Sequence, residues 1–312
     1  MGNSHRRLCL TISHILITKT HQYASENVSL FQYSVKGGAV VRRGRFYFME
    51  HGEETDRLEK KTNQQALRKQ AEWCGIKPGQ RLLDLGCGPG KSTAILHDLI
   101  QPGGSILGLD ASPERIAHAR KCYGDKRGIE FAVHDIRRPL NRFGTFDGAW
   151  VRFILEYYRR EGREIVRNTA GCLNRGGFLY LLDLDNNCLS HHELPLSLAE
   201  IIPEIVQRLE DDYNFDAHAG RKLYAHLFDL GFESIEVDVA AHHMIYGEIR
   251  DIDSYNWTKK IEVIAPRLAD LFEAYPGGYQ RFLMDFRKFF HDPRRFTYTP
   301  LIMGKGMRPY AD

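Results

Sequence analysis

The alternation of short apolar runs with helical patterns over residues 81–185 constrains the fold of this chain more than any other feature. The runs have the length of strands, and the segments between them have the apolar spacing of helices. The runs occupy residues 81–86, 105–110, 129–135, 146–153 and 178–185. Strands that alternate with helices along a chain form a parallel sheet with helices on both faces. This part of the sequence therefore predicts an α/β fold.

Helices are expected before and between these runs, at residues 54–74, 91–100 and 160–173. A further helix is expected to start at Ser112, a good N-cap residue, with Pro113 at its first position. An apolar stripe and a terminal glycine support one continuous helix over residues 54–74.

The pattern changes after residue 185, where helices become longer and strands fewer. Helical patterns cover residues 194–213, 219–230, 251–275 and 279–290, and strand candidates cover 234–245 and 297–304. We therefore expect a Rossmann-like sheet of seven strands, mostly parallel, with helices on both faces. Residues 46–312 are expected to form one domain, in which the segments 186–213 and 251–290 are helical lid insertions.

Residues 1–45 differ from the rest of the chain in charge. They carry seven Lys and Arg residues and one acid, a net charge of +6, whereas the whole chain has a formal net charge of +3. The remainder is therefore slightly acidic, which counts against a basic nucleic-acid-binding surface. We interpret residues 1–45 as a disordered N-terminal extension, with Met49 as an alternative start.

Cysteine spacing and hydropathy indicate the cellular compartment in which the protein is expected. None of the six cysteines forms a CxxC pair, which counts against a zinc ribbon and a secreted disulfide framework. No run of 18 apolar residues occurs, so no transmembrane helix is expected. We expect a cytoplasmic protein with reduced thiols.

The glycine-rich segment LLDLGCGPGK at residues 82–91 joins a predicted strand to a predicted helix. Glycines there let the backbone approach a ligand, and a helix N-terminus offers free N–H groups. Three ligands compete for such a loop. A P-loop needs glycine five residues before Gly90, where this chain has Leu85. A dinucleotide loop needs G-x-G-x-x-G, whereas Gly86, Gly88 and Gly90 are spaced G-x-G-x-G.

The third ligand is S-adenosylmethionine, because the motifs across residues 54–185 together resemble those of the class I methyltransferases. The sequence DLGCGPG at residues 84–90 matches the first motif of that family at every position. The later motifs follow in the family's order, as LGLD at 107–110, HDI at 134–136, FDGAW at 146–150 and LNRGGF at 173–178. The resemblance implies S-adenosylmethionine as cofactor.

The resemblance assigns roles to the residues that end each strand. Asp110 can accept both ribose hydroxyls, and Asp135 can accept from the adenine amino group beside the backbone of Ile136. Acids such as Asp84 suit a cationic sulfonium, and Arg152 could hold a carboxylate. A helix cap at Asp110, a solvated acid at Asp135 and a surface arginine at Arg152 are the alternatives. The candidate cofactor-binding residues are Asp84, Gly86, Cys87, Gly88, Gly90, Asp110, Ala111, Asp135, Ile136 and Arg152.

Candidate catalytic bases lie outside these motifs. His191 and His192 follow the fifth strand, where open α/β sheets bind ligands, and Glu156 follows the fourth strand. His242 and His243 lie in the sixth strand. No fixed ligand spacing joins these residues, so no metal is expected.

The acceptor is expected to be a small molecule, aromatic or lipid-like. The aromatic-rich insertion 251–290 is expected to form cavity walls with 186–213, with Tyr255, Trp257 or Tyr279 lining the cavity. Residues 215–223 resemble methyltransferases of ubiquinone and menaquinone biosynthesis. A methyltransferase acting on protein or RNA and a non-catalytic S-adenosylmethionine-binding protein are the alternatives. The acceptor atom and the oligomeric state remain open.

Overall fold

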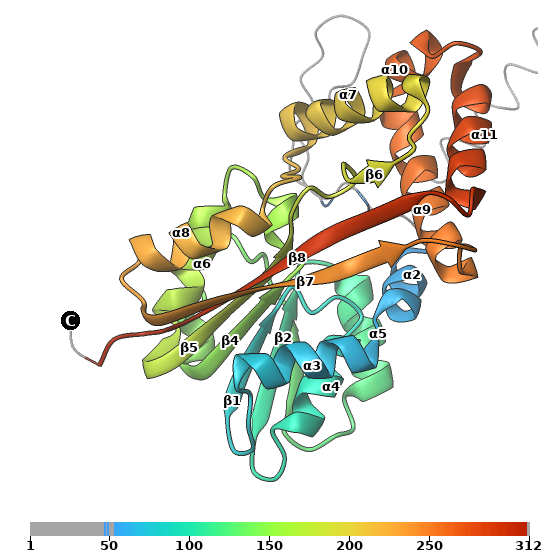
Figure 1. Cartoon of the computed structure of the whole chain (residues 1–312). Helices are drawn as coiled ribbons and strands as arrows, with labels where there is room; N and C mark the ends of the chain where they lie inside the picture. Colours follow the sequence, from blue (N-terminus) through green and yellow to red (C-terminus); the bar gives the residue numbers. More distant parts are fainter. Residues whose placement is uncertain (1–46, 48, 50–52, 311–312) are drawn as a thin grey trace, which may run out of the picture. The chain divides into compact units, whose positions relative to one another are not determined.

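The computed structural model describes residues 47, 49 and 53–310 of the chain (Figure 1). The described residues all belong to one compact unit. The predicted extension over residues 1–45 lies outside the described residues. No helix in the described ranges is long and apolar enough to cross a membrane.

One eight-stranded sheet forms the centre of the fold. Its strand order is β3-β2-β1-β4-β5-β8-β6, and β7 pairs with β8. Strands β1 to β5 pair in parallel, whereas β8 runs antiparallel to β5, β6 and β7. The strands are β1 (Arg81–Leu85), β2 (Ser105–Asp110), β3 (Ile129–Val133), β4 (Phe146–Arg152), β5 (Leu173–Leu184), β6 (His191–His192), β7 (Glu233–Ile245) and β8 (Phe296–Met307).

The α/β fold and its mostly parallel sheet are therefore confirmed. All seven predicted strands are present, and the eighth, β6, is a two-residue addition. In β6, His191 pairs with Thr297 and His192 with Phe296 at the start of β8. A strand of two residues is too short to show an apolar pattern in the sequence, and β6 forms because it pairs with β8.

Helices cover both faces of the sheet. In Figure 1, α3 and α4 lie on one face and α6 and α8 on the other. Leu82 of β1 packs with the first group, whereas Leu83 and Leu85 pack with the second, as alternation along a strand requires. The helices are α2 (Glu54–Lys61), α3 (Gln64–Cys74), α4 (Lys91–Leu99), α5 (Pro113–Tyr123), α6 (Gly162–Gly171), α7 (Leu196–Tyr213), α8 (Leu223–Asp229), α9 (Asp251–Ile264), α10 (Ala269–Ala274) and α11 (Gly278–His291).

The single helix predicted over residues 54–74 is instead two helices, α2 and α3. Thr62 after α2 is extended, with ψ of 105°. Asn63 then caps α3, because its side chain accepts a hydrogen bond from the backbone N–H of Ala66. Asparagine is a strong N-cap residue, and this local preference outweighs the continuous apolar stripe. The break places Lys61 at the end of α2.

The later helices form a second apolar core of their own. Helices α7, α9, α10 and α11 gather at one end of the sheet in Figure 1. Their buried side chains form one cluster that includes Ile202 and Val206 of α7, Trp257 of α9, Phe272 of α10 and Phe286 of α11. The segments 186–213 and 251–290 therefore pack against each other, although β7 and α8 separate them in sequence.

Candidate functional site

The loop between β1 and α4 is held in a conformation that favours glycine. Gly90, the N-cap of α4, has φ of 94°. A Cβ atom there would lie 2.7 Å from Ala119 Cβ and 3.0 Å from the Phe131 ring. At Gly86, with φ of 75°, a Cβ would meet the side chain of Ile154. The loop therefore lies close beneath the segment that follows β4.

Asp110 ends β2 directly beside this loop. Its Oδ2 atom accepts the backbone N–H of Gly88 at 3.0 Å. Its Oδ1 atom accepts the backbone N–H of Ser112 at 2.8 Å and the Arg115 guanidinium at 3.0 and 3.1 Å. Oδ2 has one hydrogen-bond partner among the described residues and keeps an acceptor position for a ligand hydroxyl. Ala111, the next residue, is exposed.

Asp84 supports the loop from inside the protein. It is buried and accepts hydrogen bonds from Ser92 Oγ at 2.9 Å and Thr93 Oγ1 at 2.7 Å. Burial raises the pKa of Asp84 to about 6, against the hydrogen bonds from the two hydroxyls. These contacts fix the first turn of α4 to the end of β1. Cys87, in the same loop, is buried as well.

Asp135 and Ile136 follow β3 at the same edge of the sheet. Arg137 forms a bidentate pair with Asp135, with both nitrogen–oxygen distances 2.8 Å. The hydrogen bonds from Arg137 lower the pKa of the Asp135 carboxyl. Ile136 is buried. Asp135 is thus a charged, partly exposed acceptor beside an apolar side chain.

Arg152 ends β4, and Phe153 follows it directly. The Arg152 Nε donates to Gln70 Oε1 at 2.8 Å, and its guanidinium lies 4.0 Å from the centre of the Phe153 ring. Burial lowers the pKa of Arg152 to about 10, so the side chain stays charged at neutral pH. Phe153 has φ of 58°, an unfavourable conformation for a bulky residue. Such strain is typical of functional sites.

The carboxylate of Asp183, on β5, fixes the turn after β4. Its Oδ2 accepts the backbone N–H groups of Ile154 at 3.1 Å, Leu155 at 2.7 Å and Glu156 at 3.3 Å. Burial and the nearby Glu156 raise the pKa of Asp183 well above its usual range. Sequence reasoning missed Asp183, whose one signal is an acid near the carboxyl end of an otherwise apolar strand.

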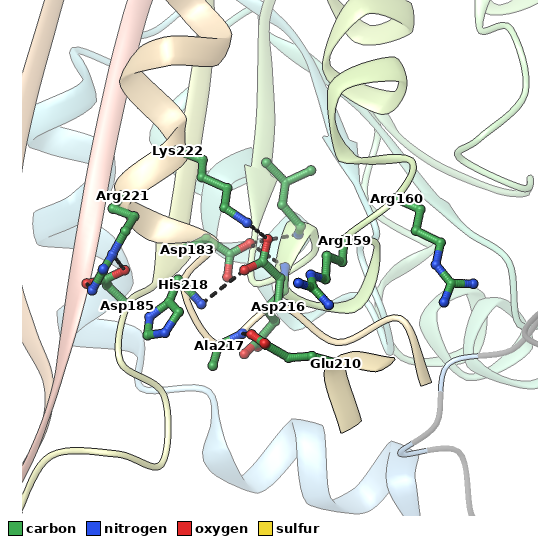
Figure 2. Close-up of polar contacts among 12 residues, drawn as sticks. Arg159, Arg160, Asp183, Asp185, Glu210, Asp216, Ala217, His218, Arg221 and Lys222 are labelled. Carbon is green, nitrogen blue, oxygen red and sulfur yellow. Dashed lines mark hydrogen bonds and ion pairs between the residues drawn. The ribbon is translucent and has the colours of Figure 1, made fainter. Parts of the chain in front are cut away.

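One ion pair ties the segment after α7 to the residue that follows β5, and a second lies within that segment (Figure 2). Arg221 forms a bidentate pair with Asp185 at 2.8 Å, and Lys222 pairs with Asp216. The backbone N–H of Asp216 donates to the carbonyl of Glu156 at 2.7 Å. These contacts give residues 215–223 a structural role beside Glu156.

Glu156 itself is buried, with 1% of its surface exposed. Its Oε2 accepts a hydrogen bond from the Asn187 amide at 2.6 Å. The structure therefore brings Glu156, which lies after β4, to Asn187, which lies in the segment after β5.

An apolar cavity lies where these segments meet the helical insertions. Its empty space is about 640 Å³, with open solvent at its entrance included. Tyr157 and Asn187 line it from the sheet side, and the helices contribute Ile202, Trp257 and Phe286. Both insertions thus supply walls, as the sequence predicts. Of the three aromatic residues proposed from the sequence, Trp257 lines this cavity, whereas Tyr255 and Tyr279 are absent from its lining.

His191 lies in the cavity wall, and His192 does not. Burial lowers the pKa of His191 to about 4, so the ring is neutral. Its Nε2 lies 3.2 Å from the Cys188 carbonyl and must donate to it, so Nδ1 accepts from Thr297 Oγ1 at 2.9 Å. The side chain of His192 is 71% exposed and faces Glu193 at 3.5 Å. Neither ring nitrogen of His191 is free to take a proton from a ligand.

His242 and His243 are adjacent residues of β7, and their ring centres lie 4.2 Å apart. Burial lowers the pKa of both imidazoles, that of His243 to about 3. The His242 ring packs 4.6 Å from the Phe153 ring. Within the part of the chain that the structure describes, no group of three or more His, Cys, Asp or Glu residues is arranged to hold a metal ion.

One tyrosine connects the loop region with the cavity. The Tyr47 ring lies 5.4 Å from the Arg115 guanidinium, which is paired with Asp110. The same ring packs edge-on against Tyr157, a cavity residue, at 4.6 Å. The glycine loop and the apolar cavity are therefore adjoining parts of one site at the carboxyl ends of the parallel strands, where open α/β sheets bind ligands.

The chain is similar to known methyltransferases over part of its length. A family model described as a methyltransferase domain matches residues 82–177. An uncharacterized 37.1 kDa transposon protein of Streptomyces fradiae is 27% identical over 158 residues, which is 50% of this chain and 44% of that protein. Trans-aconitate 2-methyltransferase of Escherichia coli is 33% identical over 103 residues, which is 33% of this chain and 38% of the enzyme. The chain thus spans less than half the length of these relatives.

A solved structure shares the fold as well. The protein, from Bacillus halodurans C-125 and described as a candidate methyltransferase, gives a TM-score of 0.53 at 17% identity. The match covers 78% of this chain and 99% of that one. The similarity thus covers a larger share of the chain than the matched domain does.

Proposed function

We propose that this chain, which belongs to the class I S-adenosylmethionine-dependent methyltransferases, transfers a methyl group to a small organic acceptor. One observation carries the proposal. The glycine loop and Asp110 lie at the same sheet edge as an apolar cavity, and Tyr47 joins the two. The methyl donor and an acceptor could therefore be held side by side.

The residues of the loop fit this cofactor. Gly86 and Gly90 let the loop turn tightly against Ile154, Ala119 and Phe131, where a side chain would not fit. Asp110 Oδ2 has acceptor capacity for a ribose hydroxyl, and Asp135 for an adenine amino group. When bound, S-adenosylmethionine supplies a methyl group activated by a positively charged sulfur. Asp84 contributes by fixing the loop, because it is buried beneath it.

The cavity supports a small acceptor with an aromatic or lipid-like part. Its walls are mostly apolar side chains, as in small-molecule sites. The trans-aconitate 2-methyltransferases among the relatives are named for a small organic acid, which supports the same class of acceptor. A link to ubiquinone or menaquinone synthesis stays a prediction.

Among the candidate bases, the geometry favours Glu156. Its carboxylate bonds to Asn187, which lines the cavity, and Asp183 fixes its backbone. A carboxylate so placed could accept a proton from an acceptor hydroxyl or amine. His191 has both nitrogens engaged, and His192 lies in solvent. We therefore propose Glu156 as the proton acceptor and His191 as a positioning residue of the cavity wall.

The acceptor class can be tested with methyl-labelled S-adenosylmethionine. The purified chain is incubated with the label and either a small-metabolite extract, an RNA fraction or a protein fraction. We expect labelled products in the metabolite extract, and their loss with Asp110→Asn. Label confined to RNA or protein would overturn the small-molecule assignment.

The compartment is a separate proposal. Cys74, Cys87, Cys122, Cys172 and Cys188 are all free thiols, as reducing conditions require. We propose a cytoplasmic location, which fractionation of the native protein would test.

A further inference from the structure

Two lysines on the contacting helices α2 and α9 have no carboxylate partner among the described residues. Lys61 ends α2, and its Nζ lies 5.5 Å from the centre of the Phe153 ring. Lys260 of α9 lines the cavity, and its Nζ lies 4.8 Å from the centre of the Trp257 ring. Among the residues that the structure describes, neither ammonium group forms an ion pair or a hydrogen bond. Both lysines are half-buried, and their aromatic contacts offset little of the cost of the lost hydration.

Their neighbours in sequence behave differently. Lys259 pairs with Glu53 at 3.1 Å and with Glu262 at 3.2 Å. Lys60 is exposed, with its charge in water. Each unpaired lysine therefore has an adjacent lysine on the same helix whose charge is satisfied.

The acids nearest to Lys61 are already engaged. Glu54 accepts two hydrogen bonds from Arg57 and one from Tyr47, each at 2.7 Å. Glu156 accepts from Asn187 at 2.6 Å. Neither acid contacts Lys61 directly, and the local balance of charge stays positive.

Buried donors without a partner lie in the same region. Trp257 is 4% exposed and lines the cavity, yet its Nε1–H has no hydrogen-bond partner in the described residues. Arg57 Nη1 is likewise buried without a partner in the described ranges. Native proteins leave few buried donors unsatisfied, so an acceptor is missing from this side of the cavity.

Electrostatics point the same way. Burial, together with repulsion from Arg57 and Lys260, lowers the pKa of Lys61 to about 7. Helices α2 and α9, which carry Lys61 and Lys260, contact each other. A row of rings connects the two lysines, because the successive ring centres of Phe153, His242, His243 and Trp257 lie 4.6, 4.2 and 6.1 Å apart. An anion placed between the two lysines would relieve the repulsion between them.

We propose that the site binds an organic anion, with its negatively charged group between Lys61 and Lys260 and its apolar body in the cavity. The inference rests on the proposed function and narrows its acceptor to a molecule with one carboxylate-like group. Phe153 and Ile154 join Lys61 to the glycine loop, so the anion lies on the side of the cavity that faces that loop.

Matched ligands test this assignment without catalysis. Binding of hexanoate, octanoate and decanoate is measured by calorimetry against the alcohol and the amine of the same length. We expect a carboxylate to bind at least about tenfold more tightly than its alcohol, and the amine to bind more weakly still. Equal affinities for carboxylate and alcohol, or no binding of any carboxylate, would overturn the proposal.

Substitutions then locate the charge. Lys61→Met and Lys260→Met should each reduce the preference for the carboxylate, and the double variant should abolish it. Lys60→Met and Lys259→Met are the controls and should leave it unchanged. A preference retained in the folded double variant would contradict the proposal; if that variant does not fold, the wild-type ligand series decides.

Binding of S-adenosylhomocysteine, measured in parallel, separates the two hypotheses. A chain that binds octanoate but not S-adenosylhomocysteine would refute the proposed function and keep the anion site. A chain that binds S-adenosylhomocysteine but not octanoate would refute the anion site and leave the proposed function standing.

Discussion

Gly90 has no room for a side chain in the glycine loop. Its φ is in the left-handed region, and Ala119 and Phe131 occupy the space where a side chain would be. Neither neighbour can move away easily, because Ala119 has no rotatable group and the Phe131 ring is buried. A side chain at position 90 would therefore displace the loop itself.

Gly90→Ala should destabilise the protein more than Gly103→Ala. Gly103 has φ of 85°, close to that of Gly90, but no atom lies within 4 Å of a Cβ there. Left-handed backbone alone costs about 1–2 kcal/mol, and overpacking adds about 1–3 kcal/mol. Denaturant unfolding of both variants measures the difference. Equal losses would mean that the contacts at Gly90 are unimportant.

Lys61 should make stability depend on pH. Its pKa is about 7 in the folded chain, against an ordinary value of 10.5. Between these values the unfolded chain holds a proton that the folded chain has released, so the free energy of unfolding rises with pH. The groups that face Lys61 are Arg57, Lys260, Glu54 and Glu156.

Lys61→Met should therefore stabilise the protein most below pH 7. The stability difference between Lys61→Met and wild type should shrink as the pH rises toward 10, because wild type then sheds the buried charge. Urea unfolding at several pH values measures this difference, with Lys60→Met as the control. A difference that stays constant with pH would contradict a perturbed Lys61.

At the scale of helices and strands, hydrophobic periodicity predicted seven strands and most helices. The break between α2 and α3 depends on local capping, and β6 depends on pairing with a distant strand. The break at Asn63 was readable in principle, because asparagine caps helices, but the apolar stripe on both sides obscured it. Strand β6 exists because His191 and His192 reach the start of β8, over a hundred residues later in the chain. No local pattern encodes such a contact.

Helix α9 should influence catalysis through Trp257. Trp257→Leu should depress methyl transfer more than S-adenosylhomocysteine binding, because Trp257 lines the cavity and the loop residues lie elsewhere. Tyr255→Leu, on the same helix but outside the cavity lining, is the control. Thermal melting corrects for folding. A large loss of stability with unchanged activity per folded molecule would make Trp257 a packing residue.

At the scale of the whole molecule, the sequence predicted one half of the site better than the other. The glycine loop, Asp110 and Asp135 belong to contiguous motifs with fixed spacing, so their meeting at one sheet edge followed from the parallel order of the strands. Asp183 and the Lys61–Lys260 pair depend on contacts between distant segments. Their chemistry becomes visible when the packing shows which charges are left without a partner.

The central claim is that the glycine loop and Asp110 bind S-adenosylmethionine. The most direct test is calorimetry of the full chain with S-adenosylhomocysteine and with NAD, for wild type, Asp110→Asn and the control Glu114→Gln from the exposed first turn of α5. We predict binding of S-adenosylhomocysteine but not of NAD, and a loss of about 1.5–3 kcal/mol for Asp110→Asn, the value of a charge-assisted hydrogen bond. Glu114→Gln should bind as wild type does. Tighter binding of NAD, or unchanged affinity in a folded Asp110→Asn variant, would contradict the claim.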